Sequence, residues 1–84
     1  MNLYLISQTV NDDYDSYDSA VVCCGNADIA RNMHPFDGTP VKWGTEEERW
    51  NGWAAKLEDV TVTFIGIADP FIKEGVVCAS FNAG

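Results

Sequence analysis

Apolar residues alternate strictly with threonine over residues 60–64, a pattern that predicts a strand with one buried face and one wet face. Val60, Val62 and Phe64 are expected to be buried, whereas Thr61 and Thr63 are expected to face water. A shift of this strand by one residue would place both threonines in the core. The segment continues into the apolar residues 65–67, so the chain must build a sheet with one covered face.

Three further apolar segments have the length of strands, namely residues 3–7, 20–24 and 76–81. An acidic loop separates the first two, and a loop that closes at Gly75 separates the last two strands of the chain. Both gaps have a length that hairpins use. The pattern therefore predicts a mainly antiparallel sheet.

A short helix is expected directly after the second strand. Asn26 is a good N-cap, Asp28 complements the helix dipole in the first turn, and Ala30 and Met33 recur at helical spacing. Pro35 should end this helix, because the residue before a proline is pushed out of the α region.

A second helical pattern lies between residues 45 and 57. Thr45 and Glu48 fit a capping box, and an apolar face follows at Trp50, Trp53, Ala54 and Leu57. Gly52 opposes the pattern, because glycine costs about 1 kcal/mol inside a helix. The segment is expected to form one helix or to break into two turns.

Together these elements predict one α+β domain that covers residues 1–84, in the order β-β-α-(α)-β-β. The expected fold is a mainly antiparallel four-stranded sheet with one or two short helices packed on one face. With 84 residues and 46% hydrophobic content, the chain should fold alone or as a small homo-oligomer.

The acidic composition of the chain limits the kinds of molecule that it can bind. Thirteen Asp and Glu residues against five Lys and Arg give a net charge of −8, which repels nucleic-acid phosphates and anionic membrane surfaces. No direct contact with nucleic acid or membrane is expected. No apolar run reaches the roughly 18–20 residues of a membrane span, and the start lacks the features of a signal peptide, so a cytoplasmic location is expected. Three cysteines without a disulfide spacing agree with a reducing compartment.

The loop after the first strand is the main candidate for a contact surface. It resembles a calcium loop, but a ligand count from Asp13 places Tyr17 at a ligand position and Asp18 at the turn glycine. A solvated loop is the simpler interpretation. A third interpretation is a contact surface for a basic partner, in which Tyr supplies rigid area and Asp pairs with Arg or Lys. Its candidate residues are Asp12, Asp13, Tyr14, Asp15, Tyr17 and Asp18.

Tryptophans are dense between residues 43 and 53. Trp50 and Trp53 have the helical spacing of core residues, whereas Trp43 lies in a loop and is expected to be partly exposed. Trp43 is therefore a candidate interface anchor, together with the nearby Glu46 and Glu47.

No arrangement of residues predicts catalysis. Cys23, Cys24, His34 and Cys78 lack the ligand spacing of a zinc site, and no phosphate loop or nucleophile–histidine–acid set occurs. His34 follows the first expected helix, where its protonated form would cap the helix end. The protein is therefore expected to be no enzyme and to need no metal or cofactor.

Four segments carry a resemblance over nearly the whole chain: residues 15–22 (DSYDSAVV), 30–35 (ARNMHP), 50–53 (WNGW) and 78–84 (CASFNAG). In these the chain resembles a family of small proteins of bacteriophages and prophages. That family has no established activity and supplies no catalytic residues. By analogy of class and charge, small acidic phage proteins are often inhibitors of host defence, including anti-CRISPR proteins that mimic the charge of DNA.

The leading hypothesis is a phage-encoded inhibitor that binds a basic surface of a host nucleic-acid-binding defence protein. One alternative is an oligomeric sponge that sequesters a signalling nucleotide between aromatic residues. A structural or virion accessory protein is the third hypothesis, in which acidity serves only solubility.

Overall fold

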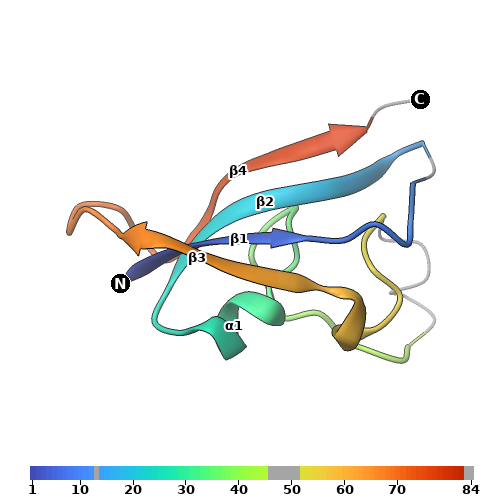
Figure 1. Ribbon diagram of the computed structural model, residues 1–84, viewed down its shortest axis with the longest axis horizontal. Coiled ribbons are helices and arrows are strands. Elements are labelled where there is room, and N and C mark those ends of the chain that lie inside the picture. The colour runs from blue at the N-terminus through green and yellow to red at the C-terminus, as the bar shows by residue number, and fades with distance from the viewer. Residues whose placement is uncertain (13, 46–51, 83–84) are drawn as a thin grey trace.

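The computed structural model of the chain describes residues 1–12, 14–45 and 52–82. A single four-stranded sheet forms the body of the molecule, with the strand order β3-β1-β2-β4 and antiparallel pairing throughout. Figure 1 shows the N-terminus at the start of β1 and α1 beneath the sheet. The elements are β1 (Asn2–Ser7), β2 (Ser16–Cys24), α1 (Ala27–Arg31), the 3-10 turn η2 (Leu57–Asp59), β3 (Thr61–Ile67) and β4 (Gly75–Asn82).

The four predicted strands are confirmed, and so is the pairing of the first two as a hairpin. The last two strands do not pair with each other, although their connection has hairpin length. They lie at opposite edges of the sheet, because β1 and β2 occupy its centre. Successive residues of a strand face opposite sides, and Cys23 and Cys24 are both buried, so the end of β2 is covered on both faces.

The predicted register of β3 is confirmed at its beginning. Val60 just before the strand is buried and Val62 is half-buried, whereas both threonines are exposed. The expectation for Phe64 was wrong, because 57% of this side chain is exposed. The Tyr4 ring contacts one side of it, with ring centroids 5.8 Å apart. As β3 is an edge strand, little else covers the other side.

The first predicted helix is confirmed as α1, whose N-cap Asn26 accepts a hydrogen bond from the backbone N–H of Ile29 at 2.9 Å. The described part of the second helical pattern is not α-helical. Gly52 has a φ of +73°, a left-handed value that ends a right-handed helix, and only η2 follows. The capping box beyond Thr45 and Trp50 lie outside the described residues. Among the described residues, no helix is long and apolar enough to cross a membrane.

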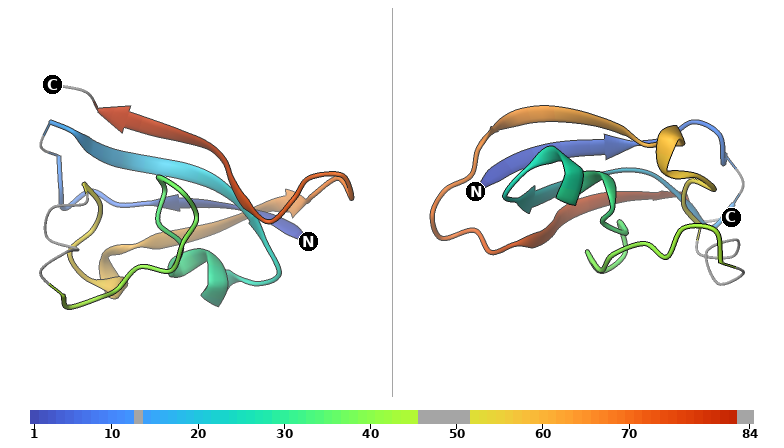
Figure 2. Two further views of the ribbon diagram at one scale, coloured as in Figure 1. Left: turned by 180° about the vertical axis from the view of Figure 1, so that it is seen from behind. Right: turned by 90° about the horizontal axis from the view of Figure 1, so that it is seen from below.

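Figure 2 shows α1 and the segments that follow it on one face of the sheet. The hydrophobic core lies between these segments and the sheet. Trp53 is buried there, which confirms its predicted place. Because the hydrophobic core lies on this face of the sheet, the fold has two layers. The core residues are Tyr4, Ile6, Ala20, Val22, Cys24, Ala30, Met33, Val41, Trp53, Ala54 and Val60.

Candidate functional site

The base of the acidic loop is held by the buried side chain of Gln8. Its amide nitrogen donates to the carbonyl oxygens of Asn11 and Tyr17, each at 2.8 Å, and its oxygen accepts from the backbone N–H of Asn11 at 2.7 Å. The side-chain amide of Asn11 donates to the carbonyl of Trp53 at 3.1 Å. These bonds tie the base of the loop to the start of β2 and to the segment that contains Trp53.

Four of the predicted contact residues are exposed on this loop and the start of β2: Asp12, Tyr14, Asp15 and Asp18. Tyr14 exposes 76% of its side chain. Tyr17 is half-buried, and its ring centroid lies 4.7 Å from that of Phe81 and 6.0 Å from that of His34. Asp13 lies outside the described residues. The loop therefore offers one exposed tyrosine rather than two.

Trp43 is half-buried, in agreement with the prediction of partial exposure. Its indole N–H donates to the side-chain oxygen of Asn32 at 2.9 Å, and its ring packs against the core. Glu46 and Glu47 lie outside the described residues. Trp43 thus has a structural role, and only its outer part is open to a partner.

The predicted capping role of His34 was wrong. Its Nδ1 accepts a hydrogen bond from the backbone N–H of Phe36 at 3.0 Å, so this nitrogen carries no proton. The ring is buried against Tyr17 instead of reaching the end of α1. The last helical carbonyls receive the backbone N–H of Asn32. His34 therefore orders the turn at residues 34–36.

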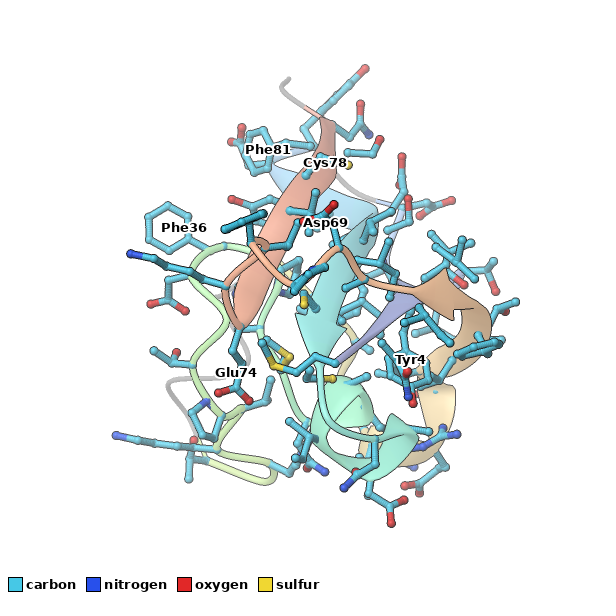
Figure 3. All side chains as sticks on the ribbon, turned by 90° about the vertical axis from the view of Figure 1, so that its left-hand side faces the viewer. Tyr4, Phe36, Asp69, Glu74, Cys78 and Phe81 are labelled. Carbon is cyan, nitrogen blue, oxygen red and sulfur yellow. The ribbon has the colours of Figure 1, made fainter. Side chains whose placement is uncertain are left out.

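An open cleft of about 760 Å³ lies between α1, the loop at residues 37–40 and the start of β4. Three carboxylates line it, one from each segment: Asp28, Asp37 and Glu74. Figure 3 shows Glu74 at the start of β4, pointing away from the strand toward the region of α1. The apolar part of the lining comes from Ile29, Met33 and Pro40.

Hydrogen bonds keep one of these carboxylates charged. The backbone N–H and the hydroxyl of Thr39 donate to Asp37 Oδ1 at 3.0 and 2.7 Å, and these bonds hold the pKa of Asp37 below its ordinary value. Near the cleft, burial raises the pKa of the Cys24 thiol, and the negative charge of Glu74 adds to this rise. The negative charge of the cleft therefore comes from its three carboxylates, Asp28, Asp37 and Glu74.

This lining suits an organic cation. A carboxylate accepts the N–H groups of guanidinium or ammonium, and the apolar floor contacts the methylene chain that carries such a group. Within the described residues, no group of three or more His, Cys, Asp and Glu side chains is placed to hold a metal ion. Of the three free cysteines, Cys23 and Cys24 are buried and Cys78 is exposed.

Sequence reasoning missed the cleft. Its carboxylates are separated by 9 and 37 positions along the chain, between Asp28 and Asp37 and between Asp37 and Glu74. No local pattern links them, and only the placement of β4 beside the end of β2 brings Glu74 into the group. Comparison of the chain with models of known protein families, with curated proteins and with solved structures gave no match.

Proposed function

We propose that the protein is a non-catalytic, phage-encoded inhibitor that binds a basic surface of a host nucleic-acid-binding defence protein. The observation that carries this proposal is the cleft that Asp28, Asp37 and Glu74 line together with apolar residues. An arginine or lysine side chain of the partner enters this cleft. The partner's basic residues then contact carboxylates in place of phosphates, in the manner of a DNA mimic.

The acidic loop supplies a second contact surface. Strand β2 runs from Ser16 beside this loop to Cys24 near the cleft, and its nine residues span about 30 Å. The two surfaces therefore lie toward opposite ends of the sheet. The cleft anchors one side chain, whereas the exposed loop accelerates association through its charge and adds the contact area of Tyr14.

The cleft also bears on the alternative of a nucleotide sponge. Carboxylates repel the phosphates of a signalling nucleotide, so this cleft favours a cationic group over an anionic ligand. A virion accessory role remains a hypothesis that the geometry does not favour, because solubility alone requires no cleft.

Two variants with equal charge changes test the proposal. One carries D28N, D37N and E74Q in the cleft, and the other carries D12N, D15N and D18N at the loop. Tagged parent and variants are used to capture partners from host lysate, and the captured protein is then titrated by calorimetry. Circular dichroism checks that each variant is folded.

The cleft variant should weaken binding at least about 30-fold, because a desolvated charge pair is worth 2 kcal/mol or more. The loop variant should lower affinity only about 2- to 10-fold, mainly through the association rate, since exposed pairs are worth about 0–1 kcal/mol each. Y14A tests the aromatic contact separately. Equal losses in the two triple variants would mean that net charge alone drives binding, and unchanged binding in both would sink the proposal.

A further inference from the structure

Strand β4 is an edge strand whose one protection against pairing is a bulge at Val77. It pairs with no strand other than β2, and at its end the carbonyl oxygen of Asn82 accepts the backbone N–H of Asp15 at 2.6 Å. Its eight residues carry no charge and no proline. Each of them is exposed or half-buried, including Val77 with 48% and Phe81 with 47% of the side chain exposed. Natural edge strands are usually blocked by a charge, a proline or a covering element. The bulge at Val77 is the irregularity that this strand has.

The charge pattern favours a second copy of this chain as the occupant. Two copies with a net charge of −8 repel each other over most of their surface, so contact requires a neutral stretch. In an antiparallel self-pair centred on Cys78, near the middle of β4, Glu74 lies opposite the uncharged Asn82. No carboxylate of the strand or its preceding residue then faces another.

The opposite edge of the sheet, strand β3, does not allow a self-pair without facing carboxylates. An antiparallel self-pair of β3 would be centred on Phe64, and it would place Asp59 of one copy opposite Asp69 of the other. Like charges directly opposite each other destabilise a strand pair. The two edges therefore differ in their capacity for self-association, although both are rich in apolar residues.

We propose that β4 of one copy pairs with β4 of a second copy about a two-fold axis and extends the sheet from four to eight strands. The antiparallel pairing of identical strands is self-complementary, which closes the assembly as a dimer. In this dimer Phe81 of one copy lies opposite Gly75 of the other. Because Gly75 and Glu74 line the cleft, the second copy adds a wall beside it.

The primary test is the molar mass in solution, measured by sedimentation equilibrium over a range of concentrations. The parent should approach twice its mass of 9.3 kDa as the concentration rises. C78K places two ammonium groups face to face at the two-fold axis and should give a monomer. T63K, on the exposed face of β3, is the matched control and should stay a dimer.

A second measurement is independent of any variant. Cys78 is the exposed thiol, whereas Cys23 and Cys24 are buried, so a short bismaleimide should cross-link two copies of the folded parent through Cys78 alone. A parent that remains a monomer at every concentration and forms no cross-linked dimer would overturn the proposal. So would larger open oligomers, or a T63K variant that is monomeric while C78K is dimeric.

Salt separates this proposal from the proposed function. Screening weakens repulsion between two acidic copies, so the dimer should tighten as salt rises. Binding of a basic partner should weaken under the same change. A monomeric protein that still captures a basic partner would therefore reject the dimer alone.

Discussion

Gly52 holds the segment that contains Trp53 against the end of the acidic loop through a backbone hydrogen bond. Its carbonyl oxygen accepts the backbone N–H of Tyr17 at 2.7 Å, and its φ of +73° lies in the left-handed region. A Cβ atom at this position would lie 2.5 Å from the carbonyl oxygen of Asp15. Only glycine therefore permits so close an approach of the two backbones.

Substitution of Gly52 tests this contact. G52A should lower the free energy of unfolding by roughly 2–4 kcal/mol, because it combines left-handed strain with a backbone clash. G44A is the matched control, since Gly44 has a similar φ of +81° but open space around its Cβ position. G44A should cost only about 1–2 kcal/mol. Urea unfolding followed by fluorescence measures both, and equal losses would contradict the assigned contact.

The three thiols should differ in reactivity and in their link to stability. Cys78 should react with a thiol reagent on mixing, whereas Cys23 and Cys24 should react on the order of 100-fold slower or more, because labelling them requires opening of the core. Burial raises the folded-state pKa of Cys24 above its ordinary value of 9.0. Between these two pKa values the unfolded chain releases a proton that the native state retains, so stability falls as pH rises above 9.0.

Mass spectrometry after timed labelling identifies the modified thiols, and unfolding curves at increasing pH report the stability. A C24A variant should lack the part of the stability loss above pH 9.0 that comes from the Cys24 thiol. Rapid labelling of all three thiols in the folded protein would contradict the burial of Cys23 and Cys24.

At the scale of elements, α1 depends on its cap more than on its length. A helix of five residues is too short to be stable alone, so Asn26 and the packing of Ala30 have to hold it. N26A should lower the free energy of unfolding by about 1 kcal/mol, whereas N26S, which retains an oxygen acceptor, should stay close to the parent. Thermal unfolding by circular dichroism compares the two, and equal losses would argue against a capping bond.

The strands show which side-chain exposures the alternation of apolar and polar residues can predict. Alternation correctly predicts that Thr61 and Thr63 face water, because the direction of a side chain in a strand depends on its position alone. The exposure of Phe64 depends in addition on whether its strand is central or at an edge. The order of the strands in the sheet decides whether a strand is central or at an edge, and the sequence of the segment does not indicate it.

At the scale of the whole molecule, the net charge of −8 opposes compaction. Salt should therefore stabilise the isolated protein, with a rise in Tm of about 2–8 °C between low and moderate salt, which corresponds to roughly 0.5–1 kcal/mol for a domain of this size. The triple cleft variant D28N, D37N and E74Q carries three fewer negative charges and should respond less. Calorimetric scans at several salt concentrations, run below the concentration at which any dimer forms, make the comparison. If salt raised the Tm of the parent and of the variant equally, the stabilisation would come from salt-dependent hydration and not from screening of charge repulsion.

Local chemistry in the sequence was sufficient for the strand segments, for α1 with its cap and for the acidity of the exposed loop. Each of these depends on neighbouring residues: the period of two in a strand, the Asn26 oxygen within reach of the third following N–H, and carboxylates that stay in water. The hypothesis of a phage-encoded inhibitor began with the sequence, through the resemblance and the net charge of −8, whereas the cleft that carries the proposal came from the structure.

Tertiary structure decided the order of the strands, the edge position of β3 and β4, and the cleft of Asp28, Asp37 and Glu74. These depend on which segments meet in space. A chain with two connections of hairpin length can pair its strands in several orders, and the choice follows from the total area that all of them bury together. Side chains 37 positions apart, such as Asp37 and Glu74, line the same cleft only through that choice, so no local pattern could predict their shared site.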